Sequence, residues 1–145
     1  MKKMLALFSV LFLVLTLNAA PPAGWMTDID KAMEKAKNEK KDLFVLFTGS
    51  DWCGYCIKLR KDVLDKEVFK KFAKDKMILL YCDSPAGEKL PPEQVFKQKL
   101  LSLKLGAGDG VPSAVILSHD GKLKGKIDGY AGADAYMKRL KEIVK

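Results

Sequence analysis

The chain has 145 residues and a formal net charge of +8, with 48% hydrophobic and 30% charged residues. This length suits one domain and excludes a second of ordinary size. The lysines are spread over the predicted helices and alternate with aspartate and glutamate, which is typical of a solvated surface. No stripe of basic and aromatic residues is present, so we expect no nucleic-acid partner. The positive surface favours acidic partners or anionic membrane surfaces instead.

The first twenty residues have the layout of a secretory signal peptide. Lys2 and Lys3 precede a charge-free apolar stretch of fourteen residues, 4–17, and small residues follow at Ala19 and Ala20. We expect cleavage near Ala19 or Ala20, which leaves a mature domain over 21–145 in an exported, periplasmic protein. An uncleaved anchor is the alternative, although a membrane span needs about 20 apolar residues.

The segment after the leader predicts a helix and then a buried strand. Thr27 is the expected N-cap of a helix over 28–40. The apolar face of that helix is expected to contain Ile29, Ala32, Met33 and Ala36. The run 42–48 (DLFVLFT) is apolar enough for a strand that is buried on both faces.

The remaining segments alternate between helices and strands. We expect helices over 65–73, 93–105 and 133–144, a buried strand over 77–82, and a hairpin of strands 114–117 and 123–127 around an Asp-Gly turn. The residues expected to face inward from the first two of these helices are Val68, Phe69, Phe72, Val95, Phe96, Leu100, Leu101 and Leu103. This order predicts an α/β fold in which helices flank a mixed central sheet.

Two cysteines lie between the first strand and the helix after it. Gly49-Ser50-Asp51 lets the backbone turn, and Cys53 and Cys56 follow as a C-x-x-C motif. Apolar residues then recur at helical spacing, so we expect Cys53 in the first turn of a helix and Cys56 one turn on. Unpaired N–H groups and the helix dipole stabilise a thiolate there and lower the pKa of Cys53. Cys53 is the expected nucleophile, and Cys56 the thiol that resolves its mixed disulfide.

The motif resembles that of exported bacterial thioredoxin-like proteins of the thioredoxin superfamily, which carry Gly-Ser-Asp-Trp-Cys-Gly-x-Cys, here residues 49–56. A second match lies about 55 residues further on, where Val111 and Pro112 precede an apolar run. The resemblance implies a cis bond before Pro112, which stands against the active-site disulfide. It also implies a thioredoxin-like fold from about Trp25 to the C-terminus, to which the helix over 28–40 is an N-terminal addition.

Residues beside the cysteines are the expected supporting positions. Asp51 and Trp52 are expected to shape the rim of the site, and capping of the helix is the alternative role for Asp51. Gly54 and Tyr55 are expected to tune the redox balance, and the same Cys-Gly-Tyr-Cys occurs in periplasmic disulfide isomerases. The backbone of Val111, next to Pro112, is expected to pair with an extended substrate segment.

The chain departs from the best-known members of the superfamily at a pair of buried charges. Those proteins have a buried Asp six residues before the first cysteine and a Lys opposite it on the neighbouring strand. Here the corresponding residues are Phe47 and, by counting back from Asp83, Leu79. Because both charges are replaced, neither is left buried and unpaired. We expect water, Cys53 or Asp51 to accept the proton of Cys56.

The third cysteine and the single histidine are isolated from the motif. Cys82 ends an apolar strand, where a free cysteine acts as a small hydrophobe. His119 lies in the predicted hairpin turn. They are not spaced as a second ligand pair for zinc, so we expect no metal site and no resident cofactor.

Together these features predict an exported thiol-disulfide oxidoreductase. Its expected partners are disulfide-containing exported proteins, which it reduces or isomerises, and a membrane thiol electron donor that recharges it. A non-catalytic thioredoxin-like binding module and a metal-handling chaperone are the alternatives that the sequence leaves open.

Overall fold

The computed structural model describes residues 20–87 and 89–145. The predicted signal peptide, apart from Ala20, therefore lies outside the described residues. Within the described ranges, no helix is long and apolar enough to cross a membrane.

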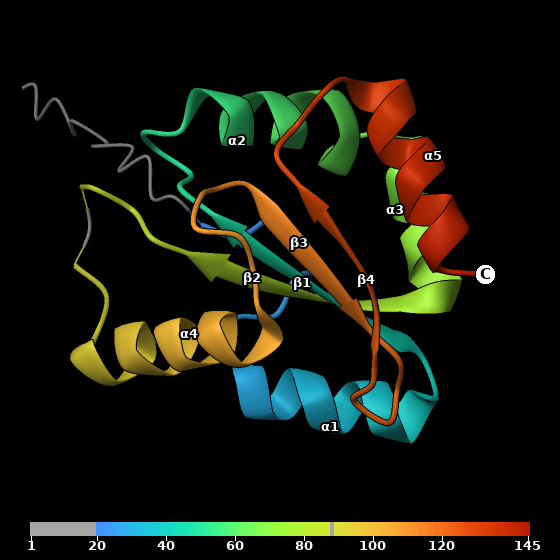
Figure 1. Ribbon diagram of the computed structural model, residues 1–145, viewed down its shortest axis with the longest axis horizontal. Helices are drawn as coiled ribbons and strands as arrows, with labels where there is room; N and C mark the ends of the chain where they lie inside the picture. Colours follow the sequence, from blue (N-terminus) through green and yellow to red (C-terminus); the bar gives the residue numbers. More distant parts are fainter. Residues whose placement is uncertain (1–19, 88) are drawn as a thin grey trace, which may run out of the picture.

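A mixed four-stranded sheet forms the centre of the described chain (Figure 1). Its strands are β1 (Asp42–Thr48), β2 (Met77–Asp83), β3 (Ser113–Leu117) and β4 (Leu123–Asp128), in the spatial order β2-β1-β3-β4. β1 runs parallel to β2 and antiparallel to β3, and β3 is antiparallel to β4. The central strands β1 and β3 are almost entirely buried, as their apolar sequences require. The predicted α/β fold with a mixed sheet and a C-terminal hairpin is confirmed.

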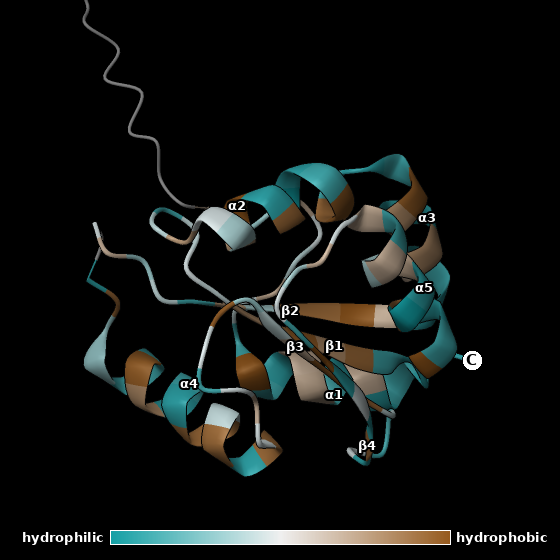
Figure 2. Ribbon diagram, turned by 45° about the horizontal axis from the view of Figure 1, so that its top comes forward, coloured by the Kyte–Doolittle hydropathy of each residue, from teal (hydrophilic) through white to brown (hydrophobic). Residues whose placement is uncertain are grey.

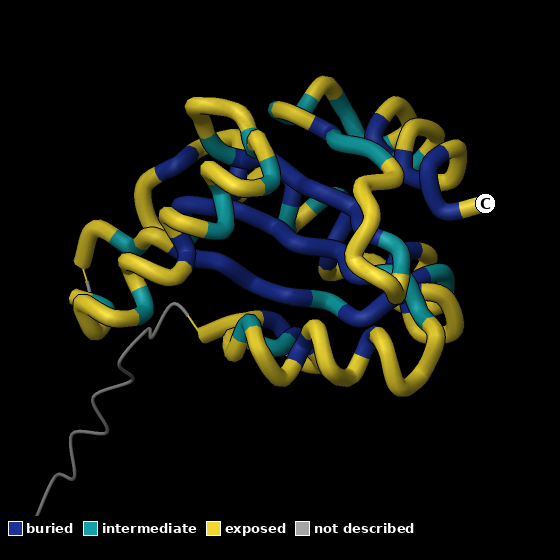
Figure 3. The backbone as a smooth tube through the Cα atoms, turned by 60° about the horizontal axis from the view of Figure 1, so that its bottom comes forward, coloured by how far each residue is buried: buried dark blue, intermediate teal, exposed yellow. Residues whose placement is uncertain are grey.

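Helices cover both faces of this sheet (Figure 1). One face carries α2 (Gly54–Leu59), the π-helix η1 (Arg60–Leu64), α3 (Glu67–Lys76) and α5 (Ala133–Ile143), and the other carries α1 (Ile29–Glu39) and α4 (Pro92–Leu105). Each face has its own hydrophobic core, one including Phe44, Phe69 and Leu140 and the other including Val45 and Leu80. Figure 3 shows β1, β2 and β3 as mostly buried and the outer sides of the helices as exposed, whereas the edge strand β4 is largely exposed or half-buried.

The predicted N-terminal helix is confirmed as α1, but its cap and its apolar face differ from the prediction. Asp28, and not Thr27, is the N-cap, and its carboxylate accepts the N–H of Lys31 at 3.0 Å. Ala32 and Ala36 are buried on the helix, whereas Met33 is 44% exposed. Met33 is one residue, and therefore about 100°, away from the buried position at Ala32, so it lies beside the contact and not in it.

The inward face predicted for α4 was wrong at four of its five residues, and only Leu101 packs against the core as expected. Val95, Phe96, Leu100 and Leu103 are exposed, whereas the side chain of Gln98 is buried and Leu101 and Leu105 pack against the core. Apolar residues occur all round this helix (Figure 2), so hydrophobic periodicity does not single out the face that meets the sheet.

α3 also differs from its prediction. It begins at Glu67 because the preceding residues form η1, which ends where the N–H of Asp65 donates to the carbonyl of Arg60 at 2.9 Å. Phe69 is buried and Phe72 is partly buried as expected, but Val68 is 64% exposed. α3 therefore contacts the core through Phe69 and Phe72 and not through Val68.

Candidate active site

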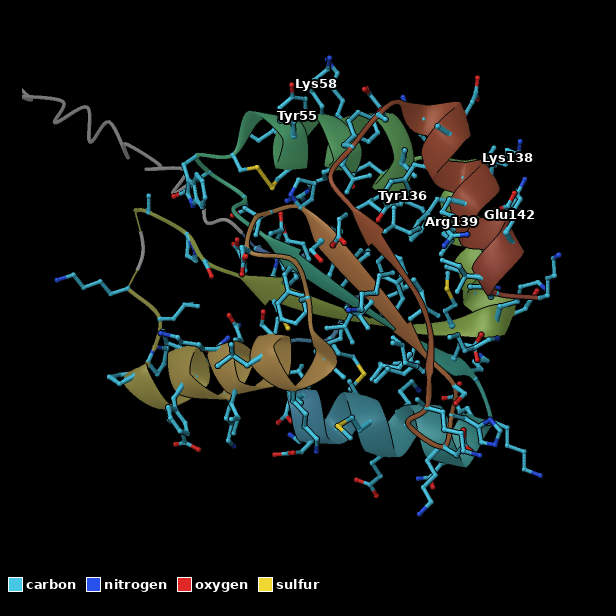
Figure 4. All side chains as sticks on the ribbon, in the orientation of Figure 1. Tyr55, Lys58, Tyr136, Lys138, Arg139 and Glu142 are labelled. Carbon is cyan, nitrogen blue, oxygen red and sulfur yellow. A yellow bond between two sulfur atoms is a disulfide. The ribbon has the colours of Figure 1, made fainter. Side chains whose placement is uncertain are left out.

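The turn between β1 and α2 brings the two cysteines to one end of the sheet, where they form a disulfide (Figure 4). Cys53 is the N-cap residue of α2, one position before the helical turn expected for it, and Cys56 lies in the first turn. The carbonyl of Gly49 accepts the N–H of Cys53 at 3.0 Å, and the N–H of Gly49 lies 3.5 Å from Sγ of Cys56. The backbone of one glycine therefore contacts both cysteines.

The sulfur of Cys53 lies where a thiolate is stabilised. It accepts the N–H of Cys56 at 3.2 Å and lies 3.5 Å from the carbonyl oxygen of Val111. Cys53 is 7% exposed and Cys56 3%, so Cys53 is the more accessible residue of the two. An N–H donor and the positive end of a helix both favour the charged form of a thiol. These features support the expectation that Cys53 is the nucleophile.

The indole of Trp52 lies over Gly49. A Cβ at residue 49 would overlap the Trp52 ring, so only glycine leaves the indole in this position. Nε1 of Trp52 donates to the carbonyl of Ser84 at 2.7 Å, and Trp52 as a whole is 55% exposed. Trp52 therefore forms one wall at the rim of the site.

Gly54 and Tyr55 occupy the surface of α2 between the cysteines. Tyr55 is exposed, and its side chain points away from the sheet (Figure 4). A Cβ at Gly54 would meet nothing within 4 Å, so open space adjoins this residue. Both positions are therefore available to an approaching partner.

Asp51 ties the active-site turn to the segment that follows β2. Its carboxylate accepts the N–H groups of Ala86 and Gly87 at 2.9 and 2.8 Å, and these bonds, Ala86 first, lower the pKa of Asp51. Because Cys53 is the N-cap of α2, the alternative that Asp51 caps this helix was wrong. A carboxyl group with a lowered pKa is also a weaker base, which disfavours Asp51 as the proton acceptor for Cys56.

The loop before β3 places Val111 beside Cys53. The Val111–Pro112 peptide bond is cis, as the resemblance implied. The carbonyl of Pro112 accepts the N–H of Gly129 at 2.8 Å, and the hydroxyl of buried Ser113 donates to Asp128 at 2.7 Å. β4 therefore holds the loop that presents the Val111 carbonyl to the cysteine.

Phe47 and Leu79 do not face each other, contrary to the prediction. In the pairing of β1 with β2, Phe47 lies beside Cys82, and Leu79 lies beside Phe44. Phe47 and Leu79 also pack into the cores on opposite faces of the sheet. The pairing of the strands, and not the residue count from Asp83, decides which side chains are neighbours. The residue that shares a face with Phe47 is thus a buried thiol.

Sequence reasoning missed Asp83, a buried carboxylate next to the active-site turn. It is the last residue of β2 and pairs with Thr48, the last residue of β1. Its two oxygens accept the backbone N–H and the hydroxyl of Ser50 at 2.9 and 2.5 Å. A buried carboxylate needs such donors, and here the turn provides them. The sequence feature that could have indicated this role is a single Asp at the end of an apolar strand.

A family model described as thioredoxin-like matches residues 24–118, which include the cysteines and the loop at Pro112. The chain belongs to the thioredoxin-like family.

Individual thioredoxin-like proteins agree with this assignment. The chain is 32% identical over 117 residues to the disulfide bond reductase DsbH of Chlamydia pneumoniae, covering 79% of this chain and 69% of the relative. A solved structure of a DsbH oxidoreductase superposes with a TM-score of 0.72 at 28% identity, covering 88% of this chain and 92% of the other. A Thermus thermophilus thioredoxin shares the fold, with a TM-score of 0.60 at 15% identity, covering 81% and 84% of the two chains. This thioredoxin-like chain is a thiol-disulfide oxidoreductase with a C-x-x-C active site.

The two isolated residues of the thioredoxin-like chain lie as predicted. Cys82 is a free, buried cysteine, and burial raises the pKa of its thiol to about 12. A thiol that stays protonated is a poor nucleophile at neutral pH. His119 is exposed in the β3–β4 turn. Among the residues that the structure describes, no group of three or more His, Cys, Asp or Glu is arranged to hold a metal ion.

Proposed function

We propose that this protein is an exported reductase that breaks disulfide bonds in exported proteins. The observation that carries the proposal is the position of the Cys53 sulfur, at the N-cap of α2 and 3.5 Å from the Val111 carbonyl. The reducing direction is supported by the similarity to the disulfide bond reductase of Chlamydia pneumoniae.

The reaction transfers two electrons to the substrate. The Cys53 thiolate attacks one sulfur of the substrate disulfide, forms a mixed disulfide and releases the other sulfur as a thiolate, which takes a proton. Cys56 then loses its proton and attacks Sγ of Cys53, which releases the second substrate thiol. Cys53 and Cys56 are left joined as a disulfide, the state that the structure shows.

The resolving step lacks the buried carboxylate of the best-known thioredoxins. Phe47 occupies that position, and the N–H of Gly49 is the donor that lies next to the Cys56 sulfur. A donor stabilises the thiolate that must form, but it does not accept its proton. Resolution should therefore be slow, and mixed disulfides long-lived. A long-lived mixed disulfide also lets a second substrate thiol attack it, which makes isomerisation the second candidate activity.

Export makes an electron donor necessary. The predicted signal peptide directs the domain to an oxidising compartment, where a dithiol reductant works only if it is recharged. A membrane thiol transporter is the class of donor that fits. The Gly-Tyr pair between the cysteines should set a potential between about −270 mV, as in thioredoxin, and about −120 mV, as in strong oxidants.

The redox state of the protein in living cells tests this proposal. Acid quenching and a maleimide gel shift should show Cys53 and Cys56 mainly reduced, and mainly oxidised once the electron supply is removed. A pool that is mostly oxidised in otherwise normal cells would contradict the reductase direction and favour an oxidase.

A further inference from the structure

Four large apolar side chains are exposed on one face of α4. Val95, Phe96, Leu100 and Leu103 have exposed fractions between 49% and 71%, and the exposed Lys99 lies among them. Steps of three and four residues join these positions, so they are neighbours on the helix surface. We call these five residues the α4 stripe. An exposed apolar patch of this kind marks an interaction site more often than an isolated exposed residue does.

The α4 stripe is continuous with the rim of the active site. A hollow of about 470 Å³ separates α4 from the active-site turn, and its walls include Trp52 and Val111 on one side and Val95, Lys99 and Leu103 on the other. A second hollow, of about 610 Å³, shares Val95 and Lys99 with the first and extends it to Phe96. The path from the Val111 carbonyl beside Cys53 therefore leads directly onto the stripe.

We propose that the α4 stripe binds the apolar segment that adjoins the reacting cysteine of a protein substrate, with a carboxylate of that segment facing Lys99. The inference rests on the proposed function. Because Cys53 is 7% exposed, a substrate sulfur reaches it between its neighbours at the rim, and two of these neighbours, Trp52 and Val111, also line the hollow beside the stripe. The reacting chain is thus the occupant that the chemistry itself brings to this surface.

The size of the stripe fits a short extended segment. The eight-residue step from Val95 to Leu103 covers about 12 Å at about 1.5 Å per residue of helix. An extended chain advances about 3.3 Å per residue, so about four substrate residues contact the full length of the stripe.

The charge of Lys99 is the reason to expect a carboxylate in the substrate segment. Lys97 on the same helix already pairs with Asp30 and Glu93 at 3.6 and 3.1 Å. Within the described ranges, no ion pair joins Lys99 to a carboxylate, although Asp109 also lines the first hollow. A single lysine among apolar side chains favours a partner that carries a carboxylate at the matching position.

The test uses activated cysteine peptides, each joined to thionitrobenzoate by a disulfide whose cleavage releases a coloured thiolate. One peptide flanks its cysteine with Leu and Glu, a second with Leu and Gln, and a third with Ser and Gln. The reduced wild-type protein should react about tenfold faster with the first than with the third. Leu103→Ser should reduce this preference to about twofold or less, because it removes an apolar contact with the substrate. Since Leu103 is exposed, this substitution does not open the core.

Three controls isolate the stripe. Lys99→Gln should remove the preference for Glu over Gln and keep the preference for Leu over Ser. Val68→Ser changes an equally exposed apolar residue on α3 and should match the wild-type protein with every peptide. The small substrate 2-hydroxyethyl disulfide, which cannot reach α4, should react at the same rate with all variants.

Equal rates of the wild-type protein with all three peptides, or an undiminished preference in Leu103→Ser, would overturn the inference. So would a Leu103→Ser variant that slows equally with 2-hydroxyethyl disulfide. Binding of the wild-type protein to phosphatidylglycerol vesicles, or its dimerisation, with peptide preference unaffected by Leu103→Ser, would assign the stripe to a lipid surface or a second copy. A wild-type protein that reacts with no disulfide at all would instead refute the proposed function.

Discussion

The carboxylate of Asp83 accepts both the backbone N–H and the hydroxyl of Ser50, at 2.9 and 2.5 Å. This pair joins the end of β2 to the turn that leads into Cys53. Through Ser50 it also fixes the neighbouring peptide of Gly49, whose N–H lies 3.5 Å from the sulfur of Cys56. A residue outside the cysteine motif thus holds part of the active-site geometry.

Asp83→Ala is expected to lower the free energy of unfolding by about 1–3 kcal/mol, because it removes the acceptor of two partly buried donors. Urea unfolding of the oxidised protein measures this loss. The matched control is Asp120→Ala, which removes a carboxylate that accepts the hydroxyl of Ser118 in an exposed turn. That control should lower the free energy of unfolding far less than Asp83→Ala does, because its carboxylate is exposed. An equal loss of unfolding free energy in the two variants would contradict a stabilising role for the hydrogen bonds between Ser50 and Asp83.

Gly49→Ala is expected to displace Trp52, since a Cβ at this residue overlaps the indole. The displaced ring loses its hydrogen bond to Ser84, which tryptophan fluorescence and unfolding both report. In a Trp52→Ala background the same change should cost less, with a coupling of about 1 kcal/mol in the double-mutant cycle. Gly54→Ala, which meets no atom within 4 Å, serves as the control. If the stability losses of Gly49→Ala and Trp52→Ala are additive in the double variant, the predicted overlap between the two residues is wrong.

Cys53 is expected to be the one thiol of the reduced protein that iodoacetamide labels rapidly at about pH 6, because a helix N-terminus and the N–H of Cys56 stabilise its thiolate. Peptide mass spectrometry after a short pulse locates the label. If Cys53 and Cys56 are labelled equally under these conditions, the assignment of the nucleophile is wrong.

Cys82→Ala should keep thiol-exchange activity and lose about 1 kcal/mol of stability through the small cavity that it leaves. The pKa of Cys82 is raised by burial from 9.0 to about 12, so its folded form holds its proton more tightly than its unfolded form. The stability that this difference contributes is complete below about pH 9 and is lost as the pH rises toward about 12. The gap in stability between wild type and Cys82→Ala should therefore shrink above pH 9. A folded Cys82→Ala variant without activity would show that this thiol takes part in turnover.

Local sequence patterns predicted much of this structure. The apolar run before the motif, the glycine in the turn and the spacing of Cys53 and Cys56 are short-range features, and each follows from backbone geometry at adjacent residues. The order of helices and strands follows from the same hydrophobic periodicity and turn signals, whereas the cis bond before Pro112 came from the resemblance to the thioredoxin superfamily. The structure confirms these elements.

Features that depend on contacts between distant segments were not predictable in the same way. The apolar residues of α4 surround the helix, so only packing on the sheet shows that Gln98 is buried and Leu103 is exposed. The register of β1 against β2 places Leu79 beside Phe44, which no count along the chain reveals. Asp83 is recognisable as part of the site only once the two strand ends are known to be adjacent.

Reduction of insulin disulfides in the presence of dithiothreitol tests the central claim most directly. The wild-type protein should accelerate the appearance of turbidity well above the rate with dithiothreitol alone, and Cys53→Ser should abolish that acceleration. A wild-type protein that adds nothing to the dithiothreitol rate, or a Cys53→Ser variant as fast as wild type, would contradict the assignment of Cys53 as the nucleophile of a disulfide reductase.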